Sequence, residues 1–560
     1  MPAHNDASIA PPLVELPIST HNRGFYDGFN RAVTIPSKII VSLLIMWAIF
    51  FPVSANKTLT AANSTIISSF AGWYVYLVAA LTVVCFLLAL SPRVGRLRIG
   101  QQSEKPEFGR FSWFAMLFGA GIGIGMLTYS TGEPLAHFSN NPDIIRGTIE
   151  PLSPEAVRPA YIYTFLHWGF AAWASYALVG LAIGYVAYRR NLPLTIRSSL
   201  APLFGMKLTG IWGHIIDIVA VVATILGVAV TMGFGVEQFV AGLARLGLGD
   251  WLLDADGSSS ATAVVMSLVI LVGASTISAL SGVGRGIKWL SNLNMALSFA
   301  LLALFAIVGS GMQGFQYLGL GLWDYLRTIV PTSLTLFSGG SETADALVRW
   351  QLDWSVFYWA WWIAFAPFVG MFIARISRGR TIREYVLGVI LVPSLMCFVW
   401  MTLVGGTAIN LELSGAAGGS IVEAGISDQL FATLSVLLPE GMASVVFGLV
   451  VILLMTYLVT SADSAILIVN TINGAGETEG QRRYHIVLWG AALAFVVGSM
   501  LILGGIDAIR ITMIIGALPF SFVVALMAVA IVKAVIFDLL RKRHGIPTTA
   551  EACAQWDEAK

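Results

Sequence analysis

The chain has 560 residues, of which 57% are hydrophobic and 11% are charged, and its formal net charge is +1. Soluble domains carry about 25% charged residues, so this composition excludes an ordinary soluble protein. We expect a membrane protein without a nucleic-acid partner. The three cysteines lie far apart in the sequence, which excludes a disulfide framework and a cysteine metal cluster.

Twelve apolar runs follow one another along the chain, and crossing a bilayer as a helix takes about 20 such residues. Continuous runs favour helices over the short alternating segments of β-barrel strands. The predicted spans are 37–53, 71–91, 108–138, 159–188, 212–244, 261–281, 286–310, 350–374, 384–408, 439–472, 484–505 and 508–537. We therefore predict an all-α polytopic membrane protein with twelve transmembrane helices.

The transmembrane part covers residues 36–540, between a mostly disordered polar tail, 1–35, and a short polar tail, 541–560. Segment 315–333 mixes aromatic residues with few charges, so we predict an interfacial helix there, and 422–437 is a second candidate. The last ten spans can form two sets of five, as in inverted-repeat transporters. These predicted repeats cover about 108–310 and 350–537.

The first span of each set has an unusual sequence. The third span carries glycine at every second position from Gly119 to Gly125, and the eighth contains Pro367 and Gly370. Each glycine costs a helix up to about 1 kcal/mol. We predict an unwound stretch in the third span, which a membrane tolerates where the backbone lines a cavity or is buried.

Lys and Arg favour cytoplasmic loops, and here they gather in alternate loops. These residues are Arg93, Arg96, Arg98, Lys105 and Arg110; Arg189, Arg190, Arg197 and Lys207; Arg285 and Lys288; Arg375, Arg378, Arg380 and Arg383; and Arg482 and Arg483. The alternate loop at 409–438 carries none. We therefore expect both termini to be cytoplasmic, in a bacterial inner membrane.

Two spans carry aromatic clusters in their middle, although Trp normally concentrates at membrane interfaces. A quaternary ammonium group has no hydrogen to donate, so ring faces select it through cation–π attraction of about 0.5–2 kcal/mol each. We interpret the clusters as a cage for a cation, with plain core packing as the alternative. They comprise Trp168, Trp173 and Tyr176 in the fourth span and Trp354, Trp359, Trp361 and Trp362 in the eighth.

The tenth span carries a hydroxyl-rich stretch that includes Thr460 and Ser461. Hard cations take oxygen ligands, including hydroxyls and backbone carbonyls. Together with carbonyls of the unwound third span, these hydroxyls predict a sodium site. The alternative is that the hydroxyls bond back to their own helix.

Carboxylates inside a membrane are functional by default, and the candidates are Asp217, Glu237, Asp353 and Asp463. Asp217 and Asp353 lie near span ends, so we expect interfacial solvation for them, and Glu237 has no assigned role. No nucleophile–base pair and no metal-ligand cluster stands out in the spans. We therefore expect neither an enzyme nor a cofactor other than a coupling sodium ion.

Four stretches of the sequence carry a resemblance to a known family. They are Gly119-Ala-Gly-Ile-Gly-Ile-Gly125 with Glu133-Pro134, His167-Trp168 with Trp173 and Tyr176, FYWAWWIAFAPFVGMFIARISRGRTIRE at 357–384, and TSADS at 460–464. With these motifs the chain resembles the betaine/choline/carnitine transporter (BCCT) family from the third span to the twelfth and beyond. The motifs are most similar to those of sodium-coupled carriers of the glycine-betaine type.

The resemblance implies a LeuT-type core of two inverted five-helix repeats after two extra helices, usually assembled as a homotrimer. The substrate ammonium is implied to sit in a box of Trp168, Trp173, Tyr176 and Trp362. Further residues implied to line the route or meet the substrate are Trp359, Phe357, Thr231, Gly121 and Gly123. The implied sodium ligands are the carbonyls of Gly119, Ile122 and Tyr457 and the hydroxyls of Thr460 and Ser461.

This chain departs from the family pattern at several positions. Thr224 and Phe368 match a second sodium site, but Val228 replaces its other hydroxyl residue, which argues against a two-sodium stoichiometry. Phe365 stands where the family often has Trp, and Ile122 replaces the usual Met of the glycine motif.

Two departures bear on substrate and coupling. Gly125 stands where choline carriers of the family tend to place Asp, which favours a zwitterion. Sodium-independent exchangers place an Arg in the fifth span, whereas no Lys or Arg lies between Lys207 and Arg245 here. The tail after Arg543 is short, so we expect weak or absent osmotic activation.

The sequence thus predicts a secondary transporter that imports a zwitterionic quaternary-ammonium or sulfonium compatible solute. Glycine betaine and dimethylsulfoniopropionate are the leading substrates, and sodium symport is the leading mechanism. Trimethylamine N-oxide, carnitine and ectoine remain open. The alternative is a proton-coupled importer of the choline or carnitine type, or a substrate/product exchanger.

Overall fold

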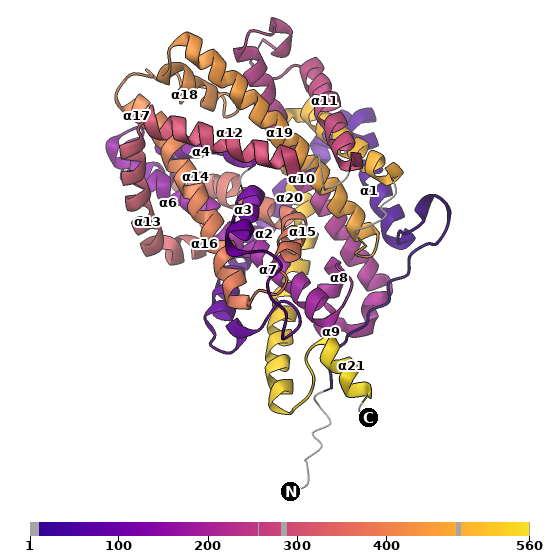
Figure 1. Ribbon diagram of the computed structural model, residues 1–560. Helices are drawn as coiled ribbons and strands as arrows, with labels where there is room; N and C mark the ends of the chain where they lie inside the picture. The colour runs from indigo at the N-terminus through magenta and orange to yellow at the C-terminus, as the bar shows by residue number, and fades with distance from the viewer. Residues whose placement is uncertain (1–9, 122, 256, 282–287, 478–482, 559–560) are drawn as a thin grey trace.

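The computed structural model describes residues 10–121, 123–255, 257–281, 288–477 and 483–558, which form a bundle of helices (Figure 1). The described part of the chain contains no β-strand, only isolated bridge pairs. The predicted all-α class is therefore confirmed.

The helices up to the middle of the chain are α1 (Arg31–Phe50), α2 (Pro52–Leu90), α3 (Arg110–Gly121), α4 (Ile124–Ser139), α5 (Pro142–Ile145), α6 (Val157–Trp168), α7 (Phe170–Arg190), α8 (Ile196–Ser199), α9 (Ala201–Phe204), α10 (Ile211–Arg245), α11 (Ala261–Ser281) and α12 (Lys288–Ile307). The helices that follow are α13 (Gly311–Leu334), α14 (Glu342–Gln351), α15 (Phe357–Ile376), α16 (Ile382–Trp400), α17 (Gly406–Leu413), α18 (Gln429–Leu437), α19 (Glu440–Asn473), α20 (Arg483–Arg543) and α21 (Ala550–Glu558). Two π-helical turns, Leu352–Val356 and Met401–Gly405, join α14 to α15 and α16 to α17.

Ten helical segments of the described chain are long and apolar enough to cross a membrane. One of them, α20, holds two predicted spans, because Gly504 and Gly505 leave helical geometry in its middle. The predicted third span corresponds to α3 and α4 together, which have 12 and 16 residues and are too short to qualify separately. All twelve predicted spans therefore correspond to helices.

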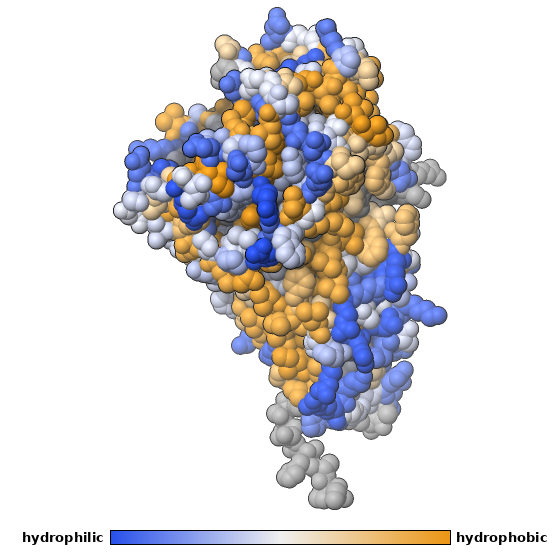
Figure 2. Space-filling view, turned by 90° about the vertical axis from the view of Figure 1, so that its left-hand side faces the viewer, coloured by the Kyte–Doolittle hydropathy of each residue, from blue (hydrophilic) through white to orange (hydrophobic). Residues whose placement is uncertain are grey.

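Apolar side chains cover a large continuous part of the face seen in Figure 2, bordered by polar side chains. Exposed apolar side chains of the described helices include Phe50 of α1 at 70%, Val269 of α11 at 69% and Val529 of α20 at 57%. A surface of this kind is unfavourable in water and suited to lipid. The protein is a multi-pass membrane protein.

The second span begins earlier than predicted. We expected a connection between residues 53 and 71, whereas α2 begins at Pro52 and has 39 residues. Proline is favoured in the first turn of a helix because its missing N–H has no partner there. The added turns carry Ser, Asn and Thr residues, so apolar runs alone could not show them.

The third span is interrupted where the glycine motif predicts. α3 ends at Gly121 and α4 begins at Ile124, and Gly123 between them is extended, with φ −153° and ψ −166°. The predicted unwinding is confirmed.

The fourth span differs from its prediction as one continuous helix. α6 ends at Trp168 and α7 begins at Phe170, because Gly169 has non-helical angles, φ −91° and ψ −138°. A Cβ at Gly169 would lie 2.4 Å from the Phe165 carbonyl oxygen and 2.7 Å from Tyr325 Oη. Only glycine fits at this break.

The first two helices of each predicted set of five are thus interrupted, in the second set by the two π-helical turns. Such a correspondence is what two repeats would produce. The division into repeats 108–310 and 350–537 stays a prediction.

A helix covers the segment predicted to be interfacial. α13 packs against α6, and Arg158 Nη2 pairs with Asp324 Oδ1 at 2.6 Å. The hydroxyl of Tyr325 accepts the Phe170 N–H at 3.0 Å and so supports the break in the fourth span. The second interfacial candidate, 422–437, contains α18.

The prediction of a mostly disordered N-terminal tail is wrong for residues 10–35. Asn30 donates from Nδ2 to the Ser19 carbonyl at 2.9 Å and from its backbone to Asn473 at 2.8 Å, and α1 begins directly after it. The C-terminal tail likewise forms α21, which lies at the lower end of the molecule in Figure 1. Polar segments of this kind are fixed by hydrogen bonds to the helical body, which apolar patterning does not reveal.

Candidate functional site

Two helices that carry the predicted aromatic box, α7 and α15, approach each other through glycine. A Cβ at Gly180 would lie 2.7 Å from the Gly370 carbonyl oxygen, and one at Gly370 would lie 3.0 Å from the Gly180 nitrogen. Real Cβ atoms essentially never come closer than 3.0 Å to such a neighbour, so the backbones can touch here only because both residues lack a side chain. This contact lies one turn from Tyr176 and two turns from Trp362.

The structure brings the four predicted box residues together. Trp168 and Trp362 have ring centroids 5.1 Å apart with planes at 72°, and Trp362 and Tyr176 have centroids 6.1 Å apart at 80°. Tyr176 and Trp173 continue the series at 5.5 Å and 80°. Each ring is no more than 6% exposed. Edge-to-face contacts of this kind also occur in ordinary aromatic core packing, so the role of these four rings as a cation cage stays a prediction.

Hydrogen bonds fix two of the rings. Trp362 donates from Nε1 to the His167 carbonyl oxygen at 2.9 Å. Trp168 donates from Nε1 to Glu133 Oε2 at 2.5 Å, and Tyr358 donates its hydroxyl hydrogen to the same oxygen. A buried indole N–H needs such a partner, so both tryptophans are held in one orientation.

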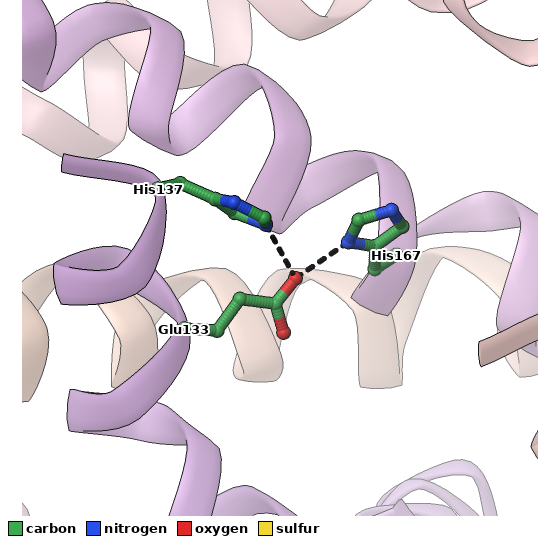
Figure 3. Close-up of side chains that lie close together, drawn as sticks. All are labelled: Glu133, His137 and His167. Atoms are coloured by element: carbon green, nitrogen blue, oxygen red, sulfur yellow. Dashed lines mark hydrogen bonds and ion pairs between the residues drawn. The ribbon is translucent and has the colours of Figure 1, made fainter. Parts of the chain in front are cut away.

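Glu133 lies at the centre of a buried polar cluster with two histidines (Figure 3). Its Oε1 is 2.6 Å from His167 Nδ1 and 3.3 Å from His137 Nε2. His167 uses its second nitrogen, Nε2, to contact Ser355 Oγ at 2.9 Å. The cluster joins α4 and α6 to the π-helical turn before α15.

Sequence reasoning missed this cluster. Glu133 entered only as part of a motif and was not among the intramembrane carboxylates, and no metal-ligand group was recognised in the spans. One ligand atom each from Glu133, His137 and His167 lies within 4.8 Å of the others, and such groups bind Zn²⁺ in other proteins. Their mutual hydrogen bonds already account for the convergence. A Glu four residues before a His, both inside a span, was the available signal.

The other residues expected to meet the substrate lie on α15, on α10 and at the end of α3 or just after it. Trp359 contacts His167 with ring centroids 5.8 Å apart, and the Arg510 guanidinium stacks on Phe357 at 4.1 Å. Thr231 is buried in α10. The remaining two, Gly121 and Gly123, flank the break between α3 and α4.

Gly125 lies against the box. A Cβ there would lie 3.0 Å from Cη2 of Trp361 and 3.4 Å from Cη2 of Trp168. A larger side chain at this position would have to displace the tryptophan rings. The helix packing therefore explains why glycine stands here.

The predicted sodium ligands are only partly placed. Tyr457, Thr460 and Ser461 lie on α19, Gly119 lies in α3, and Ile122 is outside the described residues. Thr460 Oγ1 donates back to its own helix, at 3.0 Å to the Thr456 carbonyl, and accepts from Asn294 Nδ2 at 3.1 Å. In this conformation the Thr460 hydroxyl is thus bonded within the protein.

The residues that match a second cation site in the sequence lie on α10 and α15. Thr224 and Val228 lie one turn apart on α10, and Thr224 donates to the Ala220 carbonyl at 2.7 Å. Phe368 lies on α15, with its ring centroid 5.1 Å from that of Phe365. The two helices touch where a Cβ on Gly227 would lie 3.0 Å from the Ala364 carbonyl carbon.

The four carboxylates predicted from the sequence have different environments. The expected solvation is wrong for Asp217, which is 1% exposed and accepts from Arg197 Nε at 2.5 Å. Asp353 is exposed, as expected. The half-buried Glu237 accepts from a serine of the following loop at 2.5 Å. Asp463 is fully buried and accepts from Ser278 Oγ at 2.7 Å.

The sequence model of the BCCT family, whose description is betaine/carnitine/choline family transporter, matches residues 32–539. The glycine betaine transporter OpuD of Bacillus subtilis (strain 168) is 38% identical over 490 residues, which cover 87% of this chain and 91% of the relative. The high-affinity choline transport protein of Escherichia coli (strain K12) is 36% identical, over 94% of this chain and 75% of the relative.

The osmo-dependent choline transporter BetT2 of Acinetobacter baylyi is 35% identical, over 92% of this chain and 73% of the relative. A Na+-coupled sialic acid symporter, solved in a substrate-bound outward-open state, is a distant neighbour at 13% identity with a TM-score of 0.42, covering 81% of this chain and 85% of the other. With the family match across nearly its whole length, this chain belongs to the BCCT family of betaine/carnitine/choline transporters.

Proposed function

We propose that this protein imports a zwitterionic quaternary-ammonium or sulfonium compatible solute by sodium symport. Glycine betaine is the first candidate, and dimethylsulfoniopropionate is the second because a sulfonium is also a cation without N–H donors. The observation that carries the proposal is the box of four nearly perpendicular buried rings. Relatives named for glycine betaine and choline transport support it, since both compounds carry a trimethylammonium group.

The two ends of the substrate meet different groups in this proposal. The ammonium lies against the ring faces of Trp168, Trp173, Tyr176 and Trp362. The carboxylate lies towards Thr231 and the N-terminus of α4, whose first turn has no side-chain cap. A helix N-terminus attracts anions through its free N–H groups and its dipole.

Sodium supplies the driving force in this proposal. The ion binds between the unwound third span and α19, at carbonyls of Gly119, Ile122 and Tyr457 and hydroxyls of Thr460 and Ser461. The Thr460 hydroxyl gives its hydrogen to its own helix and accepts from Asn294, which leaves its second lone pair for the ion. At ~100 mV, one inward sodium gains about 2.3 kcal/mol from the potential alone, enough for roughly 50-fold accumulation at one factor of ten per 1.4 kcal/mol.

Proton-coupled import of choline is the second candidate, and the relatives named as choline transporters favour it. The crowding at Gly125 disfavours it, because the rings leave no room there for the additional carboxylate that choline carriers tend to have. Substrate/product exchange is the remaining alternative.

The proposed setting is a bacterial inner membrane with both termini in the cytoplasm and three copies in the assembly. The alternation of Lys and Arg between loops supports this orientation. The N-terminal segment also donates a backbone hydrogen bond to Asn473 at the end of α19, where the same alternation puts the cytoplasm.

The test is uptake of labelled glycine betaine into proteoliposomes, with an inward sodium gradient, with a proton gradient, or with internal substrate. Sodium-driven uptake that is lost in Trp362→Ala and in Thr460→Ala is the expected result. Uptake under the proton gradient or with internal substrate, but not under sodium, would favour the alternatives and remove the sodium ligands.

A further inference from the structure

The buried cluster behind the aromatic box surrounds Glu133 with groups that suit an ionised carboxylate. Its two oxygens contact four groups that can each donate a hydrogen bond, namely the two histidines, the Trp168 indole and the Tyr358 hydroxyl. An ionised carboxylate is acceptor-only and offers about four lone-pair sites, and an indole N–H can only donate. A protonated carboxyl would need an acceptor for its own hydrogen. The contacts of Glu133 therefore fit its ionised form better than its protonated form.

Lys and Arg do not neutralise this charge within the described residues. Among the residues that the structure describes, the basic partners of Glu133 are His137 and His167. Each histidine can donate one N–H to the carboxylate, and Nε2 of His167 contacts Ser355 Oγ at 2.9 Å. Arg510, which stacks on Phe357, is bound to Asp507 at 3.6 Å and to the Asp353 carbonyl oxygen at 2.6 Å.

The two anchored tryptophans of the box differ in what accepts their N–H. Trp362 uses a neutral backbone carbonyl, which shows that an uncharged acceptor is sufficient to hold an indole in this box. Trp168 uses the carboxylate. Burying a carboxylate costs free energy, so a charge in this position has a reason beyond orienting the ring.

We propose that Glu133 is the fixed counter-charge of the aromatic box and sets its preference for a cationic head group over a neutral one of the same shape. This inference rests on the proposed function. Glu133 acts as a positioning residue through Trp168, because donation of an indole N–H to an anion raises the electron density of the ring. The more negative ring face attracts a cation more strongly, and the low dielectric strengthens the direct attraction.

The test compares glycine betaine with 3,3-dimethylbutanoate, in which carbon replaces the nitrogen so that shape and carboxylate are kept and the positive charge is lost. Displacement of labelled glycine betaine from the purified full chain gives both inhibition constants. The preference is the inhibition constant of 3,3-dimethylbutanoate divided by that of glycine betaine. In Glu133→Gln this ratio falls about tenfold. Glu133→Asp keeps most of the wild-type ratio because it keeps the charge. Ser355→Ala, which alters only the far side of His167, leaves the ratio unchanged.

Each outcome decides one point. Equal weakening of both ligands in Glu133→Gln, with the ratio unchanged, would make Glu133 a purely structural residue and overturn the inference. If Glu133→Gln does not fold, as judged by gel filtration, Glu133→Asp decides alone, and a lost preference there contradicts the proposal. Failure of the wild type to bind glycine betaine would reject the proposed function itself rather than the role of Glu133.

Discussion

Substituting Gly370 by alanine should weaken both the fold and the substrate site, because this glycine lets α15 touch α7. The new methyl group would lie 3.0 Å from the Gly180 nitrogen and 2.7 Å from Val179 Cγ1. Non-bonded heavy atoms prefer about 3.5–4.0 Å, so the helices must separate by roughly 0.5–1 Å. Overpacking of this kind costs about 1–3 kcal/mol.

The same separation moves two walls of the box. Tyr176 lies on α7 and Trp362 on α15, with their centroids 6.1 Å apart. Losing the contribution of one ring costs about 0.5–2 kcal/mol, which is about a 2- to 30-fold rise in Kd at one factor of ten per 1.4 kcal/mol. The assay is tryptophan fluorescence titration with glycine betaine, together with thermal unfolding of the purified protein.

Gly448→Ala is the matched control. It makes the same change in the membrane helix α19, where a Cβ would meet nothing within 4 Å. Its Kd should equal that of the wild type, and its stability should rise by up to about 1 kcal/mol through helix propensity. Wild-type Kd and wild-type unfolding temperature in Gly370→Ala would refute the reasoning.

Three further predictions concern the ion pairs, the second cation site and the break in the fourth span. Asp538→Asn should destabilise the protein by about 3–5 kcal/mol in thermal unfolding, because two buried arginines lose their counter-charge; unchanged unfolding would contradict this. Val228→Ser restores a hydroxyl one turn from Thr224 and should raise the Hill coefficient of sodium in uptake from near one towards two, whereas an unchanged coefficient would reject this second site. Tyr325→Phe leaves the Phe170 N–H without its acceptor and should cost about 1–3 kcal/mol in unfolding free energy, and a loss below about 0.5 kcal/mol would show that another group satisfies it.

Much of the box could be predicted from the sequence, because its rings lie in two motifs that also carry the family resemblance. Trp168 and Trp362 contact each other, as a shared box implies, although Gly169 separates Trp168 from the helix that carries Trp173 and Tyr176. A glycine break inside an apolar run leaves no trace in hydropathy. The need for glycine at this break comes partly from Phe398 and Tyr325, which lie on other helices and leave no room for a Cβ.

The Glu133 cluster could not be assembled in the same way. His167 lies 34 residues from Glu133 and Tyr358 lies 225 residues away, and no local pattern links them. The burial of Asp217 was missed for a similar reason. A position near a span end suggests solvent, whereas its Arg197 partner lies 20 residues earlier on a short helix that folds over it.

The most direct test of the aromatic box is the Kd of glycine betaine for the wild type, Trp362→Phe and Trp362→Leu in saturating sodium. A cation held against ring faces predicts that Kd rises stepwise, slightly for Phe, which keeps a ring, and by more than about tenfold for Leu, which has no π face. The three proteins should unfold at similar temperatures. Equal Kd values for the Phe and Leu variants would contradict the account, because only hydrophobic contact would then be holding the substrate.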